Sequence, residues 1–181
     1  MRYAVVFLCL ILLYIPSATS QETWNGLVVA PENRCSKYIS KEYSYPQSVE
    51  PKIIKSYGNR IYGPYTGTYF DTRFETDIEH MVAKSEAHDS GMCSRTKREK
   101  RLFARDLLNL TLAGSRLNKH EKRGYDVAEW LPDENKCWFV DRVIQVKQKY
   151  NLTIDEAERS AMESVLSNCT EKDKEMIFLP R

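Results

Sequence analysis

The chain has 181 residues, a hydrophobic fraction of 42% and a formal net charge of +2. This length suits one compact domain with a sizeable core. The net charge is too small to indicate a class of partner, and no internal repeat or linker divides the sequence into two domains.

The first twenty residues have the pattern of a secretory signal peptide. Arg2 precedes an almost wholly apolar run, Ala4–Ile15, and small residues follow in Pro16–Ser20. The apolar run is shorter than the roughly 20 residues that a membrane span requires, and no later stretch approaches that length. We therefore predict a secreted, extracellular protein with no membrane segment after signal removal, and a single domain over residues 21–181.

Residues 21 to about 70 are rich in Tyr, Pro, Gly and Ser, which predicts turns that join short extended pieces. Four elements are predicted in the following part of the chain: a strand over residues 76–82, a helical turn over 83–88, a helix over 97–105 and a strand over 107–113. In the second of these strands, Leu108, Leu110 and Leu112 alternate onto one face.

The rest of the chain is predicted to be helical. Ser115 is a good N-cap for a short helix that ends before Gly124. Residues 137–150 carry an apolar stripe at helical spacing that ends in Lys147. Thr153–Glu156 has the pattern of a capping box for the final helix. We expect the last two helices to be scaffold.

Four cysteines remain after Cys9 leaves with the signal peptide, and an even number suits disulfides in an oxidising compartment. Four cysteines allow three pairings, and the sequence does not decide among them. We favour Cys35–Cys93 and Cys137–Cys169, because the second pair would join two adjacent helices. The spacings exclude a zinc knuckle, since no two cysteines are close enough.

Charged residues are distributed unevenly along the chain. Acidic residues dominate residues 71–89, and basic residues dominate 95–105 and 116–123. Such neighbouring clusters suit a metal site that holds a phosphodiester, although a solvated surface is the simpler alternative. The candidate nucleic-acid-binding residues are Lys84, Arg98, Arg101 and Lys119.

Five polar residues suit metal-dependent phosphodiester hydrolysis. A neutral histidine such as His80 is a suitable base near pH 7. The carboxylates of Glu79 and Asp77 and the amide oxygen of Asn118 are ligands that Mg²⁺ prefers. Asn109 could orient the imidazole of His80 through a hydrogen bond. Adjacent strand residues point to opposite faces, so Glu79 and His80 can share a site only if the strand ends or twists there.

Four segments carry a resemblance to a known family: Thr76–Ala87, Phe103–Leu110, Ser115–Lys119 and Ala128–Pro132. They resemble the HNH nuclease domain of GmrSD-type proteins and their secreted relatives, and the resemblance covers roughly residues 57–169. The spacing of the two asparagines, Asn109 and Asn118, is also similar to that in the HNH domain of the RNA-guided CRISPR nuclease.

The resemblance implies an α+β fold with a ββα-metal (HNH, His-Me finger) core, extra C-terminal helices and one divalent ion, Mg²⁺ or Mn²⁺. It implies that His80 is the general base, that Asn109 orients it, and that Glu79 and Asn118 bind the metal with support from Asp77. We therefore predict a secreted, monomeric endonuclease that hydrolyses DNA, with RNA as a second candidate substrate, and with little sequence specificity. The alternatives are an inactive secreted effector on the same scaffold and a disulfide-stabilised interaction module.

Three sequons complicate this interpretation. Asn109 begins one of them, and a glycan there would occupy the proposed site. We expect glycans at Asn151, which follows a predicted helix, and at Asn168. Residues 98–101 also match a dibasic processing site, for which a basic nucleic-acid-binding helix is the alternative. His88 and His120 are expected on the surface.

Overall fold

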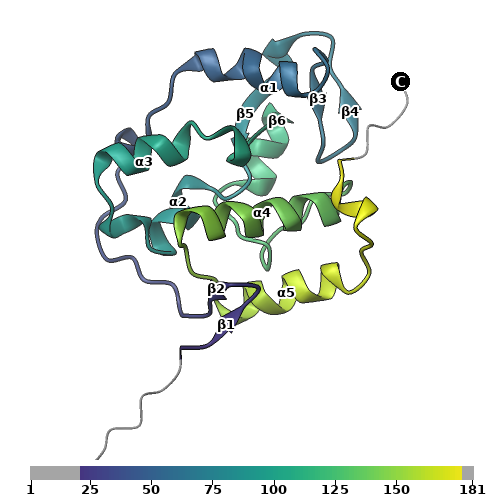
Figure 1. The fold of residues 1–181 in the computed structure, drawn as a ribbon. Helices are drawn as coiled ribbons and strands as arrows, with labels where there is room; N and C mark the ends of the chain where they lie inside the picture. Colours follow the sequence, from purple (N-terminus) through teal and green to yellow (C-terminus); the bar gives the residue numbers. More distant parts are fainter. Residues whose placement is uncertain (1–20, 177–181) are drawn as a thin grey trace, which may run out of the picture.

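The structure is a computed structural model that describes residues 21–176 (Figure 1). The predicted signal peptide lies outside the described residues. Within them, no helix is long and apolar enough to span a membrane. The described chain is a small mixed α/β domain with two disulfides.

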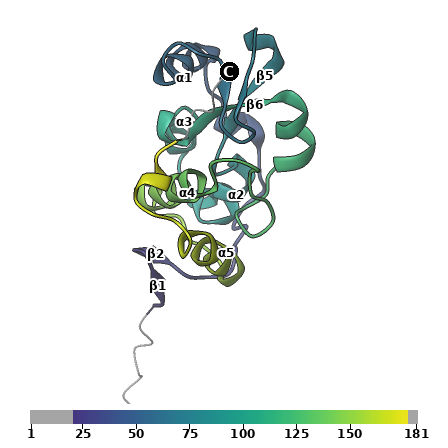
Figure 2. The same cartoon turned by 90° about the vertical axis from the view of Figure 1, so that its right-hand side faces the viewer.

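The regular structure of residues 21–176 comprises short antiparallel strand pairs, five α-helices and several short 3₁₀ and π-helical segments. The strands pair as β1 (Thr23–Trp24) with β2 (Leu27–Val28), β3 (Tyr62–Gly63) with β4 (Thr68–Tyr69), and β5 (Thr76–His80) with β6 (Leu110–Gly114). The helices are α1 (Glu50–Ser56), α2 (Lys84–Asp89), α3 (Lys97–Ala104), α4 (Lys136–Tyr150) and α5 (Glu156–Leu166). Figure 2 shows the β5–β6 pair beside the short helical segment that follows β6.

The predicted strand over residues 107–113 begins three residues late in the structure. Leu107–Asn109 instead forms one turn of 3₁₀ helix. The Asp106 carboxylate accepts a hydrogen bond from the backbone N–H of Leu108 at 3.1 Å, which favours this turn. Strand β6 then pairs in full with β5, from Thr76 opposite Gly114 to His80 opposite Leu110.

Two groups of buried apolar residues form the core. The larger one surrounds α4, which lies between α3 and α5 (Figure 1). The smaller one lies on one face of the β5–β6 pair, where Ile78, Leu110 and Leu112 pack against Tyr62 and Ile53. The alternation of Leu110 and Leu112 that predicted a strand therefore has its expected cause, burial of one face.

Both favoured disulfides are present, Cys35–Cys93 and Cys137–Cys169. The capping box predicted at Thr153–Glu156 is wrong, because α5 begins two residues later than it predicts. Asp155 is the N-cap of α5, and its carboxylate accepts a hydrogen bond from the Glu158 N–H at 2.7 Å. Aspartate is among the best N-cap residues because its oxygen satisfies an otherwise unpaired amide.

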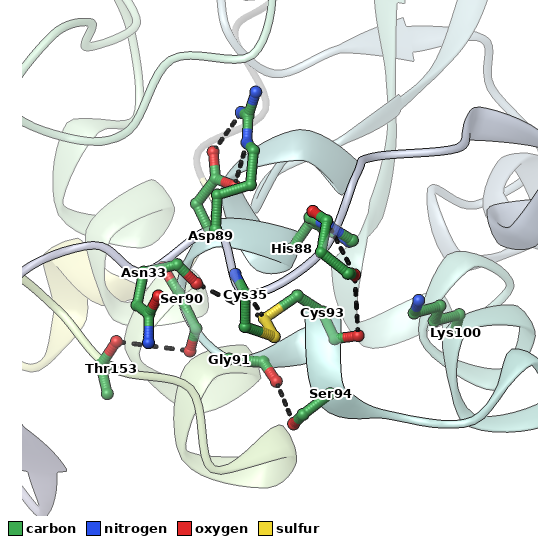
Figure 3. Close-up of a disulfide and its surroundings, with 12 residues drawn as sticks. Asn33, Cys35, His88, Asp89, Ser90, Gly91, Cys93, Ser94, Lys100 and Thr153 are labelled. Atoms are coloured by element: carbon green, nitrogen blue, oxygen red, sulfur yellow. Dashed lines mark hydrogen bonds and ion pairs between the residues drawn. A yellow bond between two sulfur atoms is a disulfide. The ribbon is translucent and has the colours of Figure 1, made fainter.

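The expectation that His88 lies on the surface is wrong. Its ring is completely buried. Nδ1 and the Tyr43 hydroxyl are 2.8 Å apart, and Nε2 donates to the Ser36 carbonyl at 2.8 Å. The Cys35–Cys93 disulfide closes the same region, as Figure 3 shows. His88 is therefore part of the packing between α2 and the N-terminal segment, whereas His120 is exposed as expected.

Candidate functional site

The end of β5 is fixed by a buried asparagine. Asn109 is fully buried, and its side-chain oxygen accepts a hydrogen bond from the Val82 N–H at 2.8 Å. Its side-chain nitrogen donates to the Val82 carbonyl at 3.0 Å, and its own carbonyl accepts from the Met81 N–H at 3.0 Å. These three bonds determine the path of the chain immediately after His80. They also meet the geometric condition set by the sequence, because β5 ends at His80.

The imidazole of His80 is held by a backbone carbonyl. Nε2 lies 2.8 Å from the Ala104 oxygen at the end of α3, and a carbonyl can only accept, so Nε2 carries the hydrogen. This leaves the lone pair on Nδ1. Burial, with a contribution from Lys84, lowers the pKa of His80 to about 3, so the ring is neutral at physiological pH. The hydrogen bond predicted from Asn109 to the His80 ring is not present: the Asn109 side chain bonds to Val82, and the Ala104 carbonyl holds the ring.

Glu79 is a buried carboxyl group with an unsatisfied oxygen. Its side chain is 4% exposed, and Oε1 has no hydrogen-bond partner among the described residues. Burial raises the pKa of Glu79 to about 7, against the opposing influence of Lys122 and Lys84. A buried acceptor without a donor is costly, so this oxygen is suited to bind a cation or a proton.

A pocket of about 300 Å³ brings four of the predicted site residues together. Glu79 and His80 come from β5, Lys84 from the first turn of α2, and Asn118 from the segment after β6. The pocket is also lined by Tyr45, whose ring centroid is 5.0 Å from that of His80. Glu79 and Asn118 are the oxygen donors here that could hold a divalent cation.

Asn118 lies in a π-helical turn, Leu117–Lys122, where the sequence predicted an ordinary short helix. The Arg123 N–H donates to the Asn118 carbonyl at 3.1 Å, five residues back. The wider turn ends with Lys122 fully buried, and its Nζ donates to the Tyr125 carbonyl at 2.6 Å. Single π-turns of this kind occur frequently at functional sites.

The remaining predicted residues lie outside this pocket. The Asp77 carboxylate forms an ion pair with Lys119, with 3.1 Å between Oδ2 and Nζ. Arg98 and Arg101 line a neighbouring groove along α3. A separate carboxylate group that the sequence did not indicate comprises Glu32, Glu86 and Asp126, whose oxygens approach within 4.8 Å of one another.

Two residues at the site were missed by the sequence analysis. Lys122 was counted only as one of several basic residues, although its charge lowers the pKa of Glu79. Tyr45 belongs to the N-terminal segment and contacts His80. No pattern near either residue identifies it, because its role depends on contacts with distant parts of the chain.

Comparisons with known proteins agree with the resemblance. The family described as GmrSD restriction endonucleases, C-terminal domain, matches residues 19–165. A protein of Arthroderma benhamiae described as an "Uncharacterized secreted protein" is 28% identical over 178 residues, which cover 86% of this chain and 87% of that protein. No solved structure gives a significant match. Because the family match spans most of this chain, the chain belongs to the family of GmrSD restriction endonuclease C-terminal domains.

Proposed function

We propose that this protein is a secreted HNH-type endonuclease that hydrolyses phosphodiester bonds in a metal-dependent reaction. The observation that carries the proposal is the shared pocket at the end of the β5–β6 pair, where Glu79, His80 and Asn118 lie together. Membership of an endonuclease domain family supports a nucleic-acid substrate. In this proposal β5, β6 and the π-helical segment correspond to the two strands and the helix of a ββα-metal core.

The donor set in the pocket fits a hard divalent cation. The unsatisfied Oε1 of Glu79 and the amide oxygen of Asn118 would hold it, with water completing the coordination. When bound, Mg²⁺ or Mn²⁺ would supply positive charge to the scissile phosphate and its leaving oxygen. Asp77 would act from outside the pocket, through its ion pair with Lys119.

His80 is the proposed general base. The hydrogen bond from Nε2 to Ala104 presents Nδ1 as the proton acceptor. A base with a pKa of about 3 is weak. A bound cation would lower this pKa and the negative charge of a phosphodiester would raise it, so His80 serves as a base near neutral pH only where the phosphate has the larger effect. Lys84 lines the same pocket and would contact the phosphate.

Export is supported by the two disulfides and by the printed description of the Arthroderma relative as secreted. Asn151 and Asn168 are exposed, so both remain candidate glycan acceptors. Asn109 is fully buried between strand and loop, and a glycan there would be incompatible with this fold. A chain modified at Asn109 would favour the alternative function, a secreted binding protein without catalysis.

The test is digestion of plasmid DNA and of RNA by the secreted protein, with Mg²⁺ or Mn²⁺ against EDTA. Wild type is compared with His80→Ala and with the exposed-histidine control His120→Ala. We expect metal-dependent cleavage that only the His80 variant loses. Glu79→Gln provides a second variant, because it removes a proposed ligand without creating a cavity. Folded wild-type protein that leaves both nucleic acids intact would refute the catalytic proposal.

A further inference from the structure

Helix α3 carries two kinds of basic side chain. On one side, Lys97 and Lys100 form ion pairs with Glu42, with Nζ to oxygen distances of 3.4 and 2.8 Å. Both lysines on this side are therefore engaged with one carboxylate within the domain. On the other side, three exposed arginines have no carboxylate oxygen within 4.0 Å among residues 21–176. They are Arg98, Arg101 and Arg105.

Arg98 and Arg101 lie on one face of α3, Arg105 is the residue that caps its C-terminus, and all three line one groove. Their spacing of three and four residues places them in a row, which covers about 10 Å along the helix axis. The groove has a volume of about 370 Å³ and is completed by Tyr45 and Pro46. Arg105 also lines the adjoining groove of about 730 Å³, where the Asp106 carboxylate is already paired with Lys149.

The arginine groove adjoins the pocket of His80. Tyr45 lines both cavities, so they meet at its side chain. Helix α3 also ends at the site, since the Ala104 carbonyl holds His80. A chain of phosphates with one member beside His80 could therefore continue past Tyr45 onto the arginine face without crossing a neighbouring acidic group in the groove lining.

We propose that Arg98, Arg101 and Arg105 bind the phosphates of the nucleic-acid strand that flank the scissile bond on one side. Guanidinium groups bind phosphate oxygens through paired N–H donors, and unpaired arginines have no internal ion pair to break. Three long and flexible arginine side chains spread over about 10 Å of chain can reach successive phosphates of one strand. The inference rests on the proposed endonuclease function in one respect, that the bound strand is the substrate.

Binding is tested separately from cleavage. We would measure the affinity of a fluorescein-labelled single-stranded DNA oligonucleotide in EDTA by fluorescence anisotropy over a range of salt concentrations. The variant is Arg98→Gln, Arg101→Gln and Arg105→Gln combined. A charge-matched control combines three exposed lysines outside both grooves: Lys55→Gln, Lys136→Gln and Lys172→Gln.

The arginine variant should bind the oligonucleotide at least about tenfold more weakly. The slope of log binding constant against log salt concentration should decrease in magnitude by about 2, which is roughly 0.7 for each of three lost phosphate contacts. The control should retain most of the wild-type affinity. Equal weakening in both variants would overturn the proposal, because it would show an effect of net charge alone.

Cleavage provides a second readout. With Mg²⁺ or Mn²⁺, the arginine variant should show a raised KM for the oligonucleotide but an unchanged kcat for bis(p-nitrophenyl) phosphate, which is too small to reach the groove. An unchanged KM for the oligonucleotide would refute the groove while leaving the endonuclease proposal intact. Wild-type protein that binds through these arginines but cleaves nothing would refute the endonuclease proposal while supporting the groove.

Discussion

Replacement of Lys147 by methionine tests how this small domain tolerates charge in its core. The Lys147 side chain is 1% exposed, and its Nζ contacts Glu86 at 2.9 Å, the Thr153 carbonyl at 3.1 Å and the Glu158 carboxylate. Both carboxylates are also buried. Lys147→Met preserves most of the side-chain volume but leaves two buried acids without their cation.

Breaking a buried ion pair by removing one partner costs about 3–5 kcal/mol. A domain of this size has a total stability of about 5–15 kcal/mol. The variant should therefore lose a large part of its free energy of unfolding, and its Tm should fall by about 10 °C. Urea denaturation at pH 7, followed by circular dichroism, measures the loss directly. A decrease below about 1 kcal/mol would refute the reasoning.

The same variant should depend on pH in a defined direction. Burial raises the pKa of Glu86, but the Lys147 charge outweighs burial and holds this pKa below its ordinary value. Loss of the Lys147 charge would let burial raise the pKa of Glu86 above that value. A carboxyl group whose folded pKa exceeds its unfolded value destabilises the fold increasingly as pH rises through that interval. The deficit of Lys147→Met should therefore be larger at pH 8 than at pH 5. Combination with Glu86→Gln and Glu158→Gln should recover at least half of the lost stability, because the buried charges are then absent.

Two further predictions concern the proposed site. Burial raises the pKa of Glu79 from 4.5 to about 7. Ionisation of Glu79 therefore costs the metal-free fold about 3 kcal/mol once pH exceeds 7, and nothing below pH 4.5. Glu79→Gln should raise Tm in EDTA at pH 8 but not at pH 4, and identical shifts in Tm at both pH values would contradict this. Asn109→Ala removes two hydrogen bonds to Val82 and should cost about 2–4 kcal/mol in urea denaturation. Asn168→Ala, which also removes a sequon at an exposed position, is its control and should change stability by less than about 0.5 kcal/mol.

Local patterns predicted the elements that position the site. The leucine alternation in β6, the helical composition of α3 and the apolar stripe of α4 each follow from burial of one face of the element. Even Lys147 at the end of that stripe has a physical reason, because its charge is balanced inside the core. The pocket residues Glu79, His80 and Asn118 were also named from the sequence, and the structure brings them together.

Contacts between distant segments could not be predicted in the same way. His88 seemed an ordinary polar residue, and its partners Tyr43 and Ser36 are 45 and 52 residues away. Tyr45 reaches His80 from an N-terminal segment that has no regular pattern. Arg98 and Arg101 lack the acid that pairs with Lys97 and Lys100 of the same helix, and this difference depends on the tertiary position of Glu42.

The placement of the two disulfides has a consequence for a nicked chain. One joins residues 35 and 93 and the other joins residues 137 and 169, so no cross-link of the described structure spans residues 94–136. A single backbone cut at the dibasic segment 98–101 would yield two fragments with no covalent bond between them. Glu79 and His80 would lie on one fragment, and Asn109 and Asn118 on the other. Limited proteolysis at this segment would thus dismantle the pocket once the fragments separate, because no disulfide keeps them together.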